Sequence, residues 1–99
     1  MHEYDNTTLV LQDGFGFLYV PLPFYKRLRE AIIFVRPALI PDEGYTIDLL
    51  LGPDIWDTLD AGGRRCAGRY VSHMVRTGKV PLRRVGCKHQ HPARYELDT

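Results

Sequence analysis

The fold is decided by residues 54–97, which read DIWDTLDAGGRRCAGRYVSHMVRTGKVPLRRVGCKHQHPARYEL. A short helix signal comes first, followed by a break with two glycines and then by a longer amphipathic segment. Two short strand-like runs end the stretch, and the glycine, proline and polar residues between them are typical of a hairpin loop. We therefore predict a helix at 55–59, a turn at 61–63, a second helix at 64–77, and strands at 80–85 and 93–97.

The second predicted helix has one apolar side. Its apolar residues recur at spacings of three and four, as expected for a helix that packs against a core. These residues are Cys66, Ala67, Tyr70, Val71, Met74 and Val75. Gly78 follows the last of them and suits the left-handed conformation that often closes a helix. On this interpretation Cys66 is a small buried residue.

Basic residues occupy another face of the same predicted helix. Arg65, Arg69, His73 and Arg76 are separated by four, four and three residues, so their side chains should line up. The hairpin adds Arg83 and Arg84, with Lys79 at its base and Lys88 at its tip. Guanidinium groups in a row suit phosphates and guanine edges, because each donates two hydrogen bonds at once. A solvated face with no ligand is the simpler alternative.

In the order of its elements and in its charge, this stretch resembles the winged helix-turn-helix family. The resemblance makes 55–59 the supporting helix, 64–77 the recognition helix and 80–97 the wing. It implies that the recognition helix enters the major groove of DNA while the wing bases hold phosphates. A winged domain has a further helix just before the supporting one, whereas residues 45–51 look like a strand. The predicted helix at 24–36 would then have to take that place.

The first half of the chain predicts a hairpin, a helix and a third strand. Residues 7–11 and 17–22 are apolar and β-branched, and the turn residues 13–16 lie between them. Residues 24–36 show an apolar helical face, although the last turn could equally be extended. The fold class expected is α+β, in one domain that covers residues 1–99.

Charge is distributed unevenly along the chain, although the formal net charge is only +1. Residues 1–59 contain four Lys or Arg against nine acids, and residues 60–99 contain nine against three. Such a split often marks a half that faces a polyanion, or two halves that attract each other. No secretory signal or apolar run of membrane-spanning length is seen, and two cysteines make no disulfide framework, so we expect a cytoplasmic protein.

Catalytic and metal-binding patterns are weak. Cys87, His89 and His91, with the distant Cys66, could in principle bind zinc, but alternating ligands in a loop are not the usual spacing. No phosphate loop, serine-centred elbow or dinucleotide fingerprint occurs. We expect no enzyme activity, no cofactor and no metal.

Two functions remain. The preferred hypothesis is a small nucleic-acid-binding protein, a regulator or accessory factor of a mobile element, that binds duplex DNA and works as a dimer. The alternative is a non-enzymatic protein-binding inhibitor or adaptor, such as a phage or plasmid counter-defence protein. Aromatic residues dense in the first quarter of the chain would then serve as interface anchors.

Overall fold

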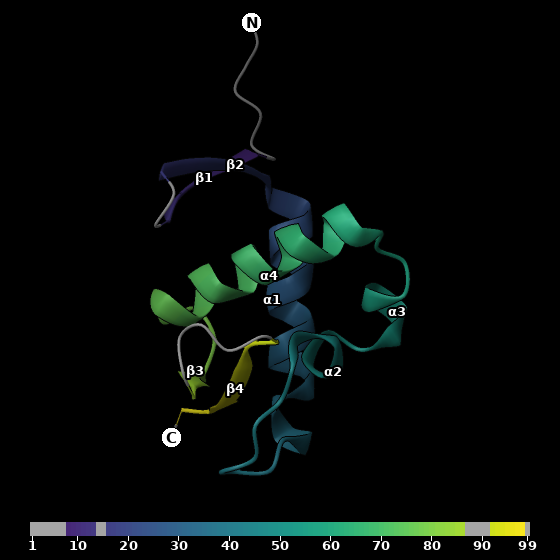
Figure 1. The fold of residues 1–99 in the computed structure, drawn as a ribbon, viewed down its shortest axis with the longest axis vertical. Coiled ribbons are helices and arrows are strands. Elements are labelled where there is room, and N and C mark those ends of the chain that lie inside the picture. Colours follow the sequence, from purple (N-terminus) through teal and green to yellow (C-terminus); the bar gives the residue numbers. More distant parts are fainter. Residues whose placement is uncertain (1–7, 14–15, 87–91, 99) are drawn as a thin grey trace, which may run out of the picture.

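The chain folds as a small α+β structure in which helices are followed by a two-stranded antiparallel hairpin, as expected (Figure 1). The computed structural model describes residues 8–13, 16–86 and 92–98. Its elements are β1 (Thr8–Asp13), β2 (Gly16–Pro21), α1 (Leu22–Val35), the 3-10 helix η1 (Arg36–Ala38), α2 (Ile47–Leu51), α3 (Pro53–Trp56), α4 (Ala61–Arg76), β3 (Leu82–Val85) and β4 (Arg94–Leu97).

The strand β2 leads directly into α1. β1 and β2 pair antiparallel, in a register that runs from Thr8 opposite Pro21 to Asp13 opposite Gly16. Pro23 lies in the first turn of α1, where a missing N–H leaves no intrahelical hydrogen bond unmade. The helix is regular to Val35, so its β-branched last turn is helical, and the Arg36–Ala38 turn then closes it.

The predicted third strand at 45–51 is wrong. Only Tyr45 is extended, and residues 47–51 form the helix α2. Leu50 and Leu51 are adjacent and both buried, which a strand could not achieve on a single face because its side chains alternate. Gly52, at a positive φ of 82°, separates α2 from α3, and Pro53 begins the next turn. A kinked pair of short helices therefore precedes α4.

The helix α4 crosses α1 near the centre of the molecule (Figure 1). Leu28 and Ile32 of α1 and Val71 and Met74 of α4 are completely buried where the helices meet. Leu50 and Tyr95 bring α2 and the C-terminal hairpin into the same core. The core therefore fixes one side of α4 and leaves the other side at the surface.

The C-terminal hairpin is joined to the loop that precedes α2. β3 and β4 pair antiparallel, with Leu82 opposite Leu97 and Arg84 opposite Tyr95. Tyr45 and Tyr95 exchange two backbone hydrogen bonds, of 2.8 and 2.9 Å. This bridge makes residue 45 a one-residue third strand beside β4. No helix in the described part of the chain combines the length and apolarity needed to cross a membrane.

Candidate nucleic-acid interface

The N-terminus of α4 is set by a capping aspartate. The Asp60 carboxylate accepts a hydrogen bond from the backbone N–H of Gly63 at 2.7 Å. A Cβ on Gly63 would lie only 3.3 Å from the Leu59 side chain, so glycine allows the chain to turn closely there. The expected turn at 61–63 is thus wrong, because those residues already form the first turn of α4 and the connection is 57–60.

The C-terminus of α4 is closed by Gly78, as predicted. Its φ is +74°, the left-handed region that favours glycine. The N–H of Lys79 donates to the Met74 carbonyl at 2.9 Å, and the N–H of Gly78 donates to the Val75 carbonyl at 3.3 Å. This pair of hydrogen bonds is the Schellman arrangement, which satisfies the last helical carbonyls. Both ends of α4 are therefore defined by local sequence.

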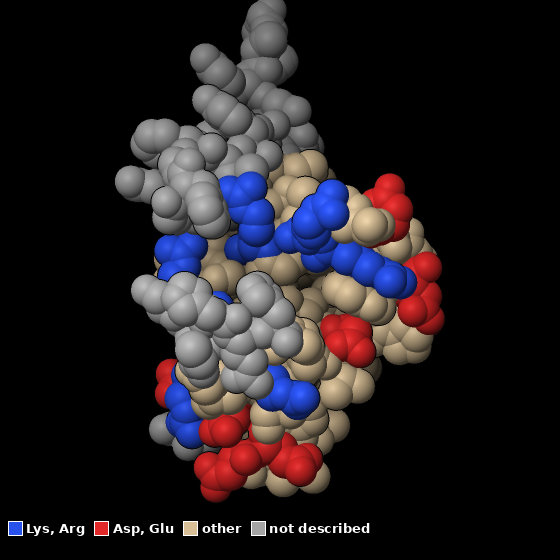
Figure 2. Space-filling view, in the orientation of Figure 1, with Lys and Arg blue, Asp and Glu red and all other residues tan. Residues whose placement is uncertain are grey.

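Three arginines share the exposed face of α4. Arg65, Arg69 and Arg76 are exposed, whereas Ala67, Tyr70, Val71 and Met74 on the opposite face are buried. Figure 2 shows a band of Lys and Arg side chains across the middle of one face, over α4, with acidic side chains at the right edge and below the band. The helix therefore presents a basic ridge, which we define as Arg65, Arg69 and Arg76.

His73 does not belong to the basic ridge, and its predicted place there is wrong. Its side chain is only 8% exposed, and its Nδ1 lies 2.9 Å from the phenol oxygen of Tyr25 on α1. The two rings also meet edge to face, with centroids 6.0 Å apart. At a spacing of four from Arg69 the histidine sits on the flank of the ridge, where α1 covers it. His73 therefore joins two helices and is not available to a phosphate.

The predicted bases of the hairpin are divided between its two faces. Arg83 lies opposite Glu96 and forms an ion pair with it at 2.8 Å. Arg84 is exposed and lies opposite Tyr95, on the face that also carries the buried Leu82. Because side chains alternate along a strand, Arg83 and Arg84 point in opposite directions. Only Arg84 is on the side of the hairpin that faces α4.

Ser72 of α4 lies close to the phenol of Tyr95 on that side of the hairpin, and it stands between Arg69 and Arg76 in the sequence. Burial raises the pKa of Tyr95, and the nearby positive charge of Arg84 and the Ser72 side chain partly offset this rise. The phenol is therefore neutral at physiological pH. The buried Tyr95 side chain shares a core with Val71 and Met74 of α4, and this core holds the hairpin that carries Arg84 beside that helix.

The other predicted bases have different positions. Lys79 is exposed just beyond the end of α4, and its carbonyl accepts a hydrogen bond from Nε of Arg29 at 2.9 Å. Lys88, at the predicted tip of the wing, lies outside the described residues. The site therefore consists of the basic ridge with Lys79 and Arg84 near it.

Sequence reasoning missed the role of Arg64. Its guanidinium lies over the ring of Trp56, 4.9 Å from the centroid, and donates to the Trp56 carbonyl at 3.2 and 3.3 Å. This contact joins α3 to the first turn of α4, so Arg64 helps to position α4. A separation of eight residues across a turn gives no local signal for such a pair.

The metal hypothesis gains no support within the described residues. There, no group of three or more His, Cys, Asp or Glu side chains is placed to hold a metal ion. Cys87, His89 and His91 lie outside the described part of the chain. Cys66 is exposed, contrary to the expected burial, because it lies at the edge of the apolar face of α4.

Comparisons with protein-family models, curated proteins and solved structures find no match for this chain.

Proposed function

We propose that the protein is a winged helix-turn-helix protein that binds duplex DNA through α4. The observation that carries the proposal is the basic ridge, in which Arg65, Arg69 and Arg76 are exposed on one side of a helix whose other side is core. A surface of this kind can meet a polyanion without disturbing the fold.

The order of the elements supports the same proposal. The helices α2 and α3 occupy the position of the supporting helix, with a short connection to α4. A helix therefore stands where the sequence suggested a strand, and α1 still has to supply the first helix of the winged pattern. The hairpin β3–β4 follows α4 directly, in the position of a wing. The element α1 serves as the first helix and packs against both α2 and α4.

Spacing along α4 suggests which of its arginines would contact bases and which would contact phosphates. Residues 65 and 76 are separated by about 16 Å along a helix axis, more than the width of about 12 Å of a major groove. Recognition helices contact base edges chiefly with their N-terminal residues. Arg65 and Arg69 would therefore approach the bases, while Arg76, Lys79 and Arg84 would contact phosphates.

The test is the affinity for duplex DNA, measured by fluorescence anisotropy over a range of salt concentrations. Arg69→Ala should weaken binding by about 1–3 kcal/mol, or reduce the salt slope by about 0.9 if its contact is a phosphate. Arg36→Ala is the matched control, because Arg36 is an exposed arginine of η1, away from α4. Its affinity should equal that of the wild type.

Two results would contradict the proposal. One is an equal effect of both substitutions, which would mean that only net charge matters. The other is a wild-type protein that binds no duplex at low salt. A duplex RNA and a single-stranded DNA probe in the same titration identify the kind of nucleic acid. If the wild-type protein binds no duplex at low salt, the protein-binding alternative becomes the working hypothesis.

A further inference from the structure

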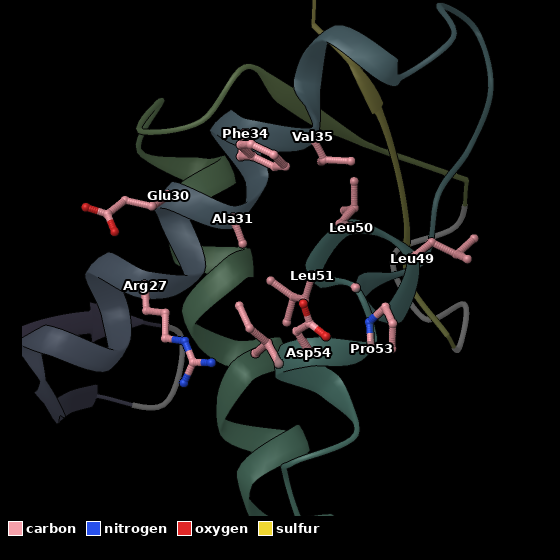
Figure 3. A pocket seen from close by; sticks show the side chains of 12 residues that line it. Arg27, Glu30, Ala31, Phe34, Val35, Leu49, Leu50, Leu51, Pro53 and Asp54 are labelled. Atoms are coloured by element: carbon pink, nitrogen blue, oxygen red, sulfur yellow. The ribbon is translucent and has the colours of Figure 1, made fainter.

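An apolar groove of about 520 Å³ lies between α1 and the pair α2–α3 (Figure 3). Its lining includes Ala31, Leu50, Leu51 and Ile55. Phe34 and Leu49 also line the groove, yet their side chains are 87% and 59% exposed. A groove of this size admits several side chains of a partner. This surface patch, made of the residues that line the groove, therefore has both the groove and the exposed ring of Phe34.

Charged residues of both signs line the same groove. Arg27 and Glu30 come from α1, and Asp54 comes from α3 on the other wall (Figure 3). No residue of α4 is among those that line it, so the groove is distinct from the basic ridge. A surface with mixed charge attracts a partner whose charges are mixed in a complementary way.

We infer that this groove docks a second copy of the chain. A two-fold interface uses one patch on both subunits, so the patch must be complementary to itself. Here the exposed Phe34 of each copy can enter the groove of the other. Arg27 of each copy can then face the acidic Glu30 or Asp54 of its partner. Each patch carries one base and two acids, so two copies can form two reciprocal ion pairs, whereas two copies of the basic ridge would repel.

Adjacent residues of α1 provide a matched test. Phe34 lines the groove, whereas Ile33 is 44% exposed and is not part of the lining. Phe34→Glu should give a particle of 11.4 kDa by analytical ultracentrifugation, while the wild type and Ile33→Glu should approach twice that mass as concentration rises. Circular dichroism checks that both variants keep their helices, as expected for exposed positions. Because the measurement contains no nucleic acid, it is independent of DNA binding.

Either of two outcomes would overturn the inference. A wild-type protein that remains at 11.4 kDa at every concentration would leave the groove to some other occupant. A Phe34→Glu protein that associates as strongly as the wild type would place the interface elsewhere.

Charge reversal tests whether the two patches meet each other. Arg27→Glu should weaken association, and so should the double variant Glu30→Arg, Asp54→Arg. A mixture of the two proteins should recover the dimer mass, because each then offers the charge that the other needs. A mixture no stronger in association than the separate variants would overturn the proposed docking.

Discussion

Tyr25 and His73 are hydrogen-bonded to each other in the core, with 2.9 Å between the phenol oxygen and Nδ1, and they join α1 to α4. They are 48 residues apart in the sequence. The contact therefore ties the flank of the basic ridge to α1.

Removing the Tyr25 hydroxyl should destabilise the fold without changing the basic ridge. In Tyr25→Phe the buried Nδ1 of His73 loses this partner, which should lower the free energy of unfolding by about 1–3 kcal/mol. Urea unfolding measures the change. In a double-mutant cycle with His73→Phe the two costs should not add, because each variant removes the same hydrogen bond. Fully additive costs would show that the pair is not coupled.

Stability should fall at alkaline pH because of Tyr95. Burial raises the pKa of its phenol above the ordinary value of 10.0. Above that value the unfolded chain loses the proton while the folded chain keeps it, so unfolding becomes easier as pH rises, by at most about 1.4 kcal/mol per pH unit. Below it the group contributes no pH dependence. Thermal unfolding of Tyr95→Phe at pH 8 to 11 should show a shallower decline than the wild type, and an identical decline would exclude this phenol as the cause.

The Asp60 cap should matter more than its acidic neighbour. Asp60→Ala removes the carboxylate that accepts from the Gly63 N–H, and loss of an N-cap costs about 0.5–2 kcal/mol. Asp57→Ala is the control, since Asp57 is also exposed and acidic but lies in the connection before α4. The denaturation midpoints of the two variants would be compared. Equal midpoints would mean that net charge, and not the cap, sets the effect.

Arg84 should contribute more to DNA binding than Arg83. Arg83 is engaged with Glu96 on the face of the hairpin away from α4, whereas Arg84 is on the face toward α4. Arg84→Ala should therefore reduce the salt slope by about 0.9, the value for one phosphate, while Arg83→Ala should change it little. The neighbouring position makes Arg83 a matched control. A larger effect at Arg83 would indicate that the opposite face of the hairpin contacts DNA.

Local sequence predicted the elements whose signals are local. The period of α4, the closing Gly78 and the C-terminal hairpin could all be read from residue spacing and turn residues. The same spacing also predicted that Arg65, Arg69 and Arg76 would share a face. These features depend on neighbours within one or two turns, so one chain segment contains the information.

Three of the errors arose where distant segments meet. Residues 47–51 contain apolar residues that suit a strand or a helix, and packing of Leu50 and Leu51 into the core selects the helix. His73 has the spacing of an exposed residue, but Tyr25 of α1 covers it. Arg83 and Arg84 looked equivalent until their strand register was known. Each outcome depends on a partner at least eleven residues away.

Tyr95 is hydrogen-bonded to Tyr45 through its backbone and buries its side chain in the core, so one residue anchors the hairpin in two ways. The offset between Arg84 on the strand and the arginines of α4 is consequently preset by the scaffold. On the DNA-binding proposal, cationic side chains held at a fixed spacing would lose little conformational entropy on binding. They would match only a ligand whose phosphates have the same spacing.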